Sequence, residues 1–253
     1  MITINGHSLF YIYHAGRADG PALVLIHGAG GRHSDWPTQI RHMANTAVYS
    51  LDLPGHAQST GSGHDTIDGY ADVVQAFIES LGLERVVLVG HSMGGAIAQI
   101  LALRGLTQLS GLVLVGTSAR LRVGDAILHN ILPNFDKAVG LINKYTWSRS
   151  ARPVQVGLAK RLMAETKPEI LHGDFFACNA FDVREELGKI ALPTLVVSGS
   201  ADMMTPAKHG QALAKGIPNA EFVQIAGAGH FLIQEKPHQV AEAIQQFLAS
   251  VFS

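Results

Sequence analysis

The residue best suited to covalent chemistry is Ser92, which stands in the sequence GHSMGG (residues 90–95) with a glycine two positions to either side. The apolar run VVLV (residues 86–89) precedes it, and a helical pattern begins directly after it. A side chain at the apex of a sharp strand-to-helix turn needs flanking residues without bulk, which Gly90 and Gly94 supply. The pattern therefore predicts a serine hydroxyl held at the end of a strand, where it could act as a nucleophile.

A nucleophilic serine needs a base, an acid that orients the base, and N–H donors for the developing oxyanion. His230 follows a glycine-rich turn in FVQIAGAGH, and Asp202 follows the apolar run LVVSG. The segment HGAGG (residues 27–31) follows a third apolar run, and its glycines expose backbone N–H groups. The chain order Ser92, Asp202, His230 is one of the three known for such triads, which makes acyl transfer the predicted chemistry.

The elements that must position these residues are buried strands alternating with helices. Continuous apolar runs are typical of strands buried on both faces of a parallel sheet, whose carboxyl ends are where ligands bind. The predicted strands are residues 22–27, 47–51, 86–89, 112–115, 194–199 and 221–225. The predicted helices are residues 67–81, 94–103, 207–216 and 237–252. A hairpin turning at Asn5-Gly6 is expected to precede them, with its second strand running through HSLFYIY.

The alternation is interrupted between about Ala119 and Asp182. This segment contains no good strand pattern, and its nine Lys and Arg against six Asp and Glu give it a net charge of +3. We expect a helical cap over one end of the sheet, inserted after the sixth strand. Residues 1–118 and 183–253 would form the core domain and residues 119–182 the cap.

Composition limits the class of protein. The chain has 253 residues, of which 47% are hydrophobic and 15% charged, and a formal net charge of −1. We therefore expect a compact cytoplasmic protein that binds neither nucleic acid nor membranes, as a monomer or homodimer. One cysteine, Cys178, excludes an internal disulfide and is expected to be a small buried residue. No metal site is expected because HExxH is absent and the 13 histidines do not cluster with carboxylates, and no nucleotide-binding loop is evident.

Taken together, the motifs resemble those of serine enzymes of the α/β-hydrolase superfamily that carry a helical cap. The resemblance spans nearly the whole chain through HGAGG (27–31), DLPGHAQS (52–59), GHSMGG (90–95), SGSADMMTP (198–206) and GAGH (227–230). It implies a mostly parallel central sheet flanked by helices and an active site that needs no cofactor. In such enzymes Ser92 would attack an acyl carbon, His230 would move the proton and Asp202 would orient His230.

The resemblance also implies an oxyanion hole formed by the backbone N–H groups of Ala29 and Met93. Other histidines are expected to be structural: His27 and His91 would brace the two turns by hydrogen bonding, and His56, with Asp52, would shape a loop behind the site. The remaining candidates for contact with substrate are Gly28, Gly30, Ile127, Leu128 and Phe231. Asp125 is the alternative acid.

The substrate is less well determined than the reaction. Dehalogenases and epoxide hydrolases of this fold carry aspartate where this chain has Ser92. We expect hydrolysis of carboxylic esters with small or medium apolar acyl groups, with water as co-substrate. The alternatives are lactonase, thioesterase, perhydrolase and carbon–carbon bond hydrolase, although Gly31 stands where the last class usually carries proline. A ligand receptor that retains the triad is the alternative outside enzymology.

Overall fold

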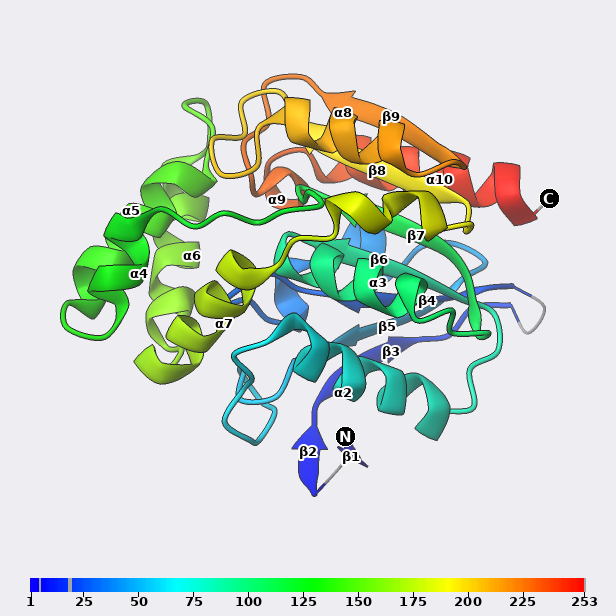
Figure 1. The fold of residues 1–253 in the computed structure, drawn as a ribbon, viewed down its shortest axis with the longest axis horizontal. Helices are drawn as coiled ribbons and strands as arrows, with labels where there is room; N and C mark the ends of the chain where they lie inside the picture. Colours follow the sequence, from blue (N-terminus) through cyan, green and yellow to red (C-terminus); the bar gives the residue numbers. More distant parts are fainter. Residues whose placement is uncertain (5, 18–19, 253) are drawn as a thin grey trace.

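The computed structural model describes residues 1–4, 6–17 and 20–252. A seven-stranded sheet runs through the centre in the order β3-β5-β4-β6-β7-β8-β9, and all neighbouring strands are parallel except β3, which is antiparallel to β5 (Figure 1). Its strands are β3 (Tyr11–His14), β4 (Ala22–Ile26), β5 (Ala47–Leu51), β6 (Val86–His91), β7 (Leu109–Val115), β8 (Thr194–Gly199) and β9 (Ala220–Ile225). The predicted α/β-hydrolase fold is confirmed.

Helices cover both faces of the sheet because its strands are apolar on both faces. Along β4, Leu23 and Leu25 enter one hydrophobic cluster, while Val24 and Ile26 enter the other. The helices that pack on the Val24 side are α2 (Ile67–Ser80), α3 (Met93–Leu103) and α8 (Ala207–Gly216). Those on the Leu23 side are α1 (Thr38–Arg41), α9 (Leu232–Glu235) and α10 (Pro237–Phe252). Short 3₁₀ turns are formed by η1 (His33–Asp35) and η2 (Arg184–Lys189).

The N-terminal hairpin differs from the prediction. The run HSLFYIY forms two strands, because β2 (His7–Leu9) pairs with β1 (Ile2–Ile4) in a separate sheet whereas β3 joins the central one. The chain leaves β2 at Phe10, whose N–H donates to the Ser59 hydroxyl. In the predicted turn, Gly6 has φ +80° and Asn5 lies outside the described residues. The segment predicted to form a cap consequently follows the seventh strand, β7, and not the sixth.

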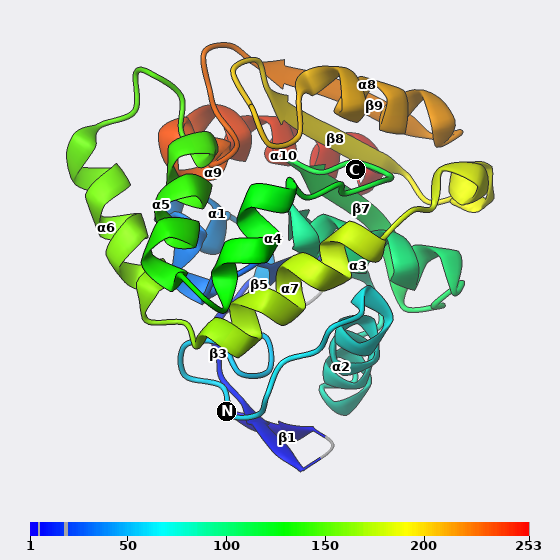
Figure 2. The same ribbon diagram turned by 60° about the vertical axis from the view of Figure 1, so that its left-hand side comes forward.

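Four helices stand between β7 and β8. They are α4 (Asp125–Ile131), α5 (Phe135–Thr146), α6 (Pro153–Ala164) and α7 (Pro168–Ala180). They lie together at the left of Figure 1, and in Figure 2 they come forward over the sheet. The two chain segments at their base are joined, because Leu121 N–H donates to Phe181 O and Val183 N–H to Ala119 O. We propose on this basis that residues 119–182 form a cap domain.

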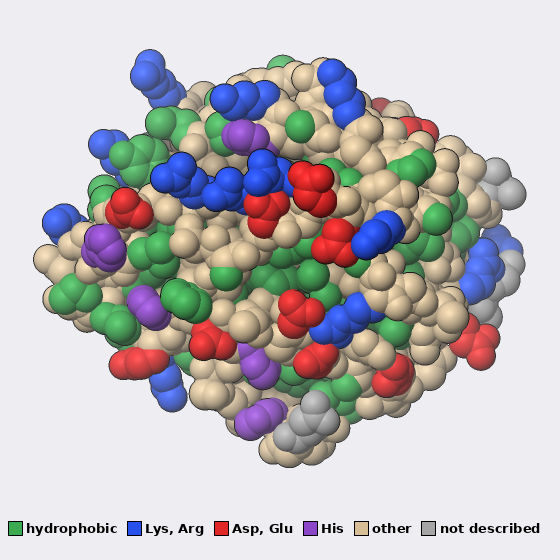
Figure 3. Space-filling view, viewed as in Figure 1, with side chains coloured by type: hydrophobic (Ala, Val, Ile, Leu, Met, Phe, Trp, Pro, Cys, Tyr) green, Lys and Arg blue, Asp and Glu red, His purple; other side chains and the backbone are tan. Residues whose placement is uncertain are grey.

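On the face seen in Figure 3, Lys and Arg side chains gather over the upper part, whereas Asp and Glu side chains are more frequent over the middle and lower part. Apolar side chains are most visible over the cap helices at the left. Within the cap, the exposed large apolar residues are Leu132, Val154, Leu158 and Phe176. No helix in the described ranges is long and apolar enough to cross a bilayer.

Candidate active site

Ser92 occupies the turn between β6 and α3. Its backbone angles, φ 53° and ψ −115°, lie in a region that non-glycine residues rarely adopt. Two close approaches explain the flanking glycines: a Cβ on Gly90 would lie 2.2 Å from Gly94 O, and a Cβ on Gly94 would lie 2.2 Å from Ile26 O. The Ser92 N–H donates to Val115 O at 2.9 Å, which ties the turn to the next strand. The serine is therefore held on a tight, strained turn.

The residues predicted as base and acid meet Ser92 from two other strand ends. His230 Nε2 lies 3.0 Å from Ser92 Oγ, and His230 Nδ1 lies 2.9 Å from Asp202 Oδ2. Asp202 follows β8 and His230 follows β9, so the three side chains come from adjacent regions of one sheet edge. His230 and Asp202 are buried, and Ser92 is half-buried and lines a cavity. The geometry allows a proton to pass from the hydroxyl to the imidazole.

Asp202 is held as a carboxylate by its neighbours. Burial alone would raise the pKa of Asp202, but the charge and hydrogen bond of His230 and the donors of Thr205 outweigh it and hold that pKa below its ordinary value. Asp202 Oδ1 accepts from the backbone N–H groups of Met204 and Thr205, each at 2.8 Å. The Thr205 hydroxyl lies 2.7 Å from Asp202 Oδ2 and 3.1 Å from His230 Nδ1. Thr205, which the sequence reasoning did not single out, thus completes the support of the acid.

The loop predicted to supply an oxyanion donor lies beside Ser92. A Cβ on Gly28 would lie 3.2 Å from the Ser92 Cβ, so the two turns are in close contact. Gly28 O accepts from Gly31 N–H at 3.0 Å, and Gly30 N–H donates to Asp174 Oδ2 at 2.7 Å; these bonds fix the backbone on both sides of Ala29. Met93 is the first residue of α3, so its amide has no acceptor one turn earlier in the helix. Its side chain is fully buried in the core.

His27 and His91 make hydrogen bonds of the bracing kind. The Leu53 N–H donates to His27 Nε2 at 3.0 Å, so that ring is neutral and donates through Nδ1 to Gly28 O. Burial lowers the pKa of His27 to about 4 and that of His91 to about 3. His91 Nε2 donates to the backbone carbonyl of His230 at 2.9 Å and so connects the serine turn to the base loop.

A second group of polar residues lies on the cap side of the site, and the sequence reasoning missed its centre. Asp174 on α7 is fully buried and accepts hydrogen bonds from Gly30 N–H, His56 Nε2 and the Tyr70 hydroxyl. One indication of this role is present in the sequence: Asp174 lies on the same side of a helical pattern as the apolar residues Leu171, Phe175 and Cys178. Within the described residues, no three His, Cys, Asp or Glu side chains are grouped so as to hold a metal ion.

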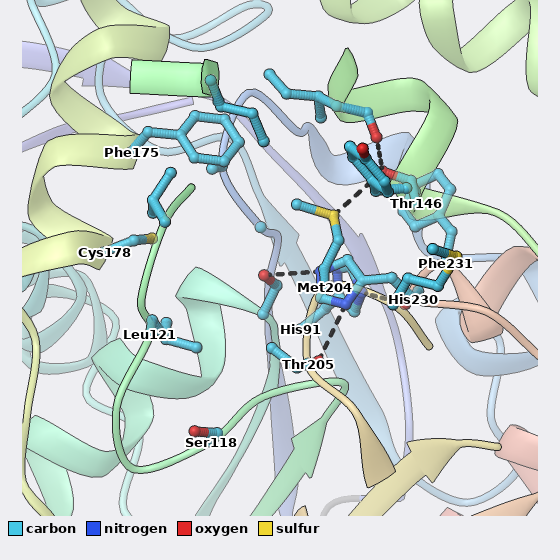
Figure 4. A pocket seen from close by; sticks show the side chains of 18 of the residues that line it. His91, Ser118, Leu121, Thr146, Phe175, Cys178, Met204, Thr205, His230 and Phe231 are labelled. Atoms are coloured by element: carbon cyan, nitrogen blue, oxygen red, sulfur yellow. Dashed lines mark hydrogen bonds between the residues drawn. The ribbon is translucent and has the colours of Figure 1, made fainter. Parts of the chain in front are cut away.

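A cavity of about 940 Å³ opens above Ser92 between the strand ends and the cap. Figure 4 shows Phe175 and Cys178 from α7 on one wall, with Met204, His230 and Phe231 on the opposite side. The mostly apolar walls include Leu121, Ile127, Leu141, Ile142, Phe175, Met204 and Phe231. Burial raises the pKa of the Cys178 thiol, so this side chain is an uncharged part of the wall. Asp35 also lines the cavity, and burial raises its pKa to about 6.

Four of the five residues predicted to contact substrate line the cavity, and one does not. Gly28, Gly30, Ile127 and Phe231 line the cavity, together with Ala29. Leu128 does not line it; this side chain is half-buried and packs against the hydrophobic core instead. Leu128 lies about 100° from Ile127 around the axis of α4, which turns its side chain towards that core. Asp125, the alternative acid, is exposed at the first turn of α4 and is absent from the cavity lining.

Comparison with known proteins agrees with the fold. Residues 23–243 match the alpha/beta hydrolase family, and the chain belongs to this family. A solved structure described as a thermophilic esterase is 32% identical, with a TM-score of 0.87 over 99% of this chain and 97% of that one. A pimeloyl-[acyl-carrier protein] methyl ester esterase of Xanthomonas oryzae is 29% identical over 92% of this chain and 96% of its own length. A 2-hydroxy-6-oxononadienedioate/2-hydroxy-6-oxononatrienedioate hydrolase of Comamonas testosteroni is 26% identical over 98% and 96%, respectively.

Proposed function

We propose that this protein is a serine hydrolase that cleaves carboxylic esters of small or medium apolar acyl groups through an acyl-enzyme. The observation that carries the proposal is the chain of contacts from Ser92 Oγ to His230 Nε2 at 3.0 Å and from His230 Nδ1 to Asp202 Oδ2 at 2.9 Å. The relatives described as esterases add support, because they cover nearly the whole chain.

In the proposed mechanism, Ser92 Oγ attacks the acyl carbon while His230 Nε2 takes the hydroxyl proton. The carbonyl oxygen becomes an oxyanion that accepts from the N–H groups of Ala29 and Met93. The alcohol leaves with the proton from His230, which yields the acyl-enzyme. Water then attacks the acyl carbon, His230 takes the proton from water, and Ser92 is released with that proton. Asp202 keeps the imidazole oriented and stabilises the imidazolium.

The apolar part of the cavity wall supports the proposal of an apolar acyl chain, and Arg32, Arg120, Arg122 and Arg184 line other parts of the same cavity. Its volume of about 940 Å³ and its largely aliphatic and aromatic walls give room for several methylene groups. Each buried methylene contributes roughly 0.8 kcal/mol. We infer that the cap supplies most of this surface and so sets the acyl preference.

Carbon–carbon bond hydrolysis remains the principal alternative reaction, and the local geometry at Gly31 argues against it. Gly31 N–H donates to Gly28 O, a bond that proline in this position could not make. A Cβ on Gly31 would also lie 2.7 Å from Asp35 Oδ2. The loop of this chain is therefore not built for the proline typical of those hydrolases.

The test is a substrate panel run with the wild type, Ser92→Ala and a control serine variant. p-Nitrophenyl esters from acetate to decanoate, a thioester, a lactone and a vinylogous 1,5-diketone would be compared by kcat/KM. We expect the esters to be preferred, Ser92→Ala to lose at least roughly 10⁴-fold in kcat, and Ser80→Ala, on the exposed end of α2, to match the wild type. Preference for the diketone, or an active Ser92→Ala, would contradict the proposal.

A further inference from the structure

A charged group deep inside the protein needs an explanation. The Asp174 carboxylate has no solvent exposure, although removing a carboxylate from water costs several kcal/mol. It lies on α7, one residue from Phe175 and four from Cys178, both of which line the cavity. A buried ion pair often adds little to stability, so we ask what the hydrogen bonds of Asp174 hold in place.

The partners of Asp174 come from three separate parts of the core. Its Oδ2 accepts from Gly30 N–H at 2.7 Å and from His56 Nε2 at 2.9 Å. Its Oδ1 accepts from the Tyr70 hydroxyl of α2 at 2.5 Å. Gly30 is the neighbour of Ala29 in the segment HGAGG, and it lies 144 residues from Asp174 along the chain. The carboxylate therefore joins the cap directly to the loop proposed to stabilise the oxyanion.

The hydrogen bonds of His56 define a cation beside this carboxylate. His56 Nδ1 lies 3.0 Å from Pro54 O, which can only accept, and Nε2 faces Asp174. Both ring nitrogens therefore donate, which makes the ring an imidazolium. Burial acts to lower the pKa of His56, but the charge and hydrogen bond of Asp174 overcome it and raise that pKa above its ordinary value. Asp174 is thus a paired carboxylate whose oxygens are fixed from two sides.

The remaining contacts of Gly30 also come from the cap. Gly30 has φ +61°, and a Cβ placed there would lie 2.5 Å from Leu171 Cδ1, so the helix packs directly on the loop. The Thr166 hydroxyl donates to Gly30 O at 3.4 Å. On its other side the loop contacts the Ser92 turn through Gly28. The loop is consequently held between the nucleophile turn and the cap.

We propose that Asp174 is a positioning residue that acts through Gly30 to aim the Ala29 N–H at the oxyanion. The kinetic part of this inference rests on the proposed ester hydrolysis, whereas the effect on the loop does not. Without the carboxylate, Gly30 N–H loses its acceptor, and the peptide units of residues 28–31 keep only the Gly31–Gly28 and Thr166–Gly30 bonds to hold their orientation. The expected consequence is weaker stabilisation of the transition state with little change in the binding of the ester ground state.

The experiment compares Asp174→Ala, Asp174→Asn and Glu169→Ala with the wild type. Glu169 lies on the same helix, is exposed and serves as the matched control. Thermal unfolding first confirms that each variant is folded. Kinetics on p-nitrophenyl butyrate give kcat and KM, and inhibition by an aliphatic trifluoromethyl ketone reports on the oxyanion hole. Amide hydrogen exchange of the peptide that contains residues 28–31 reports on the loop without any substrate.

For Asp174→Ala we expect kcat to fall about 10- to 100-fold, less than the loss of a whole oxyanion donor, with KM within about threefold. Affinity for the trifluoromethyl ketone should fall in parallel with kcat/KM, and the loop amides should exchange at least roughly 10-fold faster. Asp174→Asn retains an oxygen that can accept from Gly30 N–H, so it should recover at least about fivefold in kcat. Glu169→Ala should match the wild type in every measurement.

Two results would overturn the inference. One is unchanged exchange of the loop amides in Asp174→Ala or, where that variant is too unstable, in Asp174→Leu, whose side chain fills the space but cannot accept from Gly30 N–H. The other is faster exchange with an unchanged kcat, or a loss confined to KM. An inactive wild type would instead contradict the proposed function, and the hydrogen-exchange measurement would still judge whether Asp174 fixes the loop.

Discussion

At the scale of single residues, the site combines a strained serine with rigidly held partners. Ser92 has φ 53°, a conformation that costs on the order of 1–3 kcal/mol and persists because the surrounding structure enforces it. Asp202 receives two backbone N–H bonds, and the Thr205 hydroxyl lies 2.7 Å from it. Such preorganisation means that little rearrangement is needed when charge develops in the transition state.

Asp35 gives the cavity a carboxyl group whose ionisation opposes folding. Its pKa is about 6 in the folded protein, against an ordinary value of 3.8. Below pH 3.8 the group is protonated in both states and has no effect on stability. Between pH 3.8 and about pH 6 the unfolded chain releases the Asp35 proton more readily than the folded chain does. The free energy of unfolding therefore falls as the pH rises through this range, and the decrease is complete above about pH 6.

We therefore predict that Asp35→Asn raises the free energy of unfolding at pH 8 and leaves it unchanged near pH 4. The amide can still accept the hydrogen bond from Arg32 N–H, which is 2.9 Å in the wild type. Urea unfolding at the two pH values measures the difference. Asp65→Asn, at an exposed position, should change the free energy of unfolding by the same small amount at both pH values. Equal stability of Asp35→Asn and wild type at pH 8 would contradict the assignment.

What the sequence could predict at this scale depended on local motifs. Ser92, His230 and Asp202 each follow an apolar run and lie in or beside glycine-rich turns, so their positions at strand ends could be read directly. Asp174 and Thr205 have no such flanking pattern. The partner of Asp174 in the oxyanion loop is 144 residues away, and only the folded chain brings the two together.

At the scale of elements, the close approach of α3 to β4 brings the two turns of the site together. A Cβ at Gly94 would lie 2.2 Å from Ile26 O and 2.8 Å from His27 O, both of which are backbone atoms that cannot move aside. Gly94 therefore allows the Met93 amide and the loop after β4 to lie on the same side of Ser92, as the proposed oxyanion hole requires. Any side chain at this position must push the helix away from the strand.

We predict that Gly94→Ala lowers the free energy of unfolding by at least about 2 kcal/mol and lowers kcat in whatever protein remains folded. Chemical unfolding and ester hydrolysis would measure the two effects. Gly140→Ala is the matched control, because nothing lies within 4 Å of a Cβ at that position in the middle of α5. That variant should be more stable by about 0.5–1 kcal/mol. A Gly94→Ala protein as stable as the wild type would contradict the close-packing explanation.

Sequence periodicity predicted most elements well because buried strands and amphipathic helices have distinct patterns. β8, α8 and α10 have the predicted bounds. The N-terminal hairpin is present, but its second strand is shorter than predicted, since alternation continues through Phe10 and does not reveal that β2 and β3 belong to different sheets. The sequence also could not orient Leu128, which packs against the core, because the rotation of a helix about its own axis depends on tertiary packing.

At the scale of the whole molecule, the cavity lies between the sheet edge and helices α4 to α7, so in the proposed function both would set the substrate preference. Ile127 of α4 is buried and lines the cavity, whereas Leu132 at the end of the same helix is 52% exposed. A larger side chain at position 127 should fill part of the cavity in which we propose that the acyl chain binds. A large side chain at position 132 should instead extend into solvent.

We predict that Ile127→Trp lowers the ratio of kcat/KM for p-nitrophenyl octanoate to that for p-nitrophenyl acetate by at least roughly 10-fold, since several methylene groups lose their apolar contacts. Leu132→Trp should leave the ratio unchanged. Steady-state kinetics on the two esters measure it. An unaltered ratio in Ile127→Trp would mean that the acyl chain binds elsewhere in the cavity.

The most direct test of the proposed acyl-enzyme mechanism is to trap the covalent intermediate. Wild-type protein would be mixed with p-nitrophenyl butyrate, quenched with acid during the first turnover and analysed by intact mass and peptide mapping. We predict a burst of p-nitrophenol and a single butyryl group on Ser92, with no adduct in Ser92→Ala. Ester turnover that proceeds without an acyl group on Ser92, or with the acyl group on another residue, would contradict it.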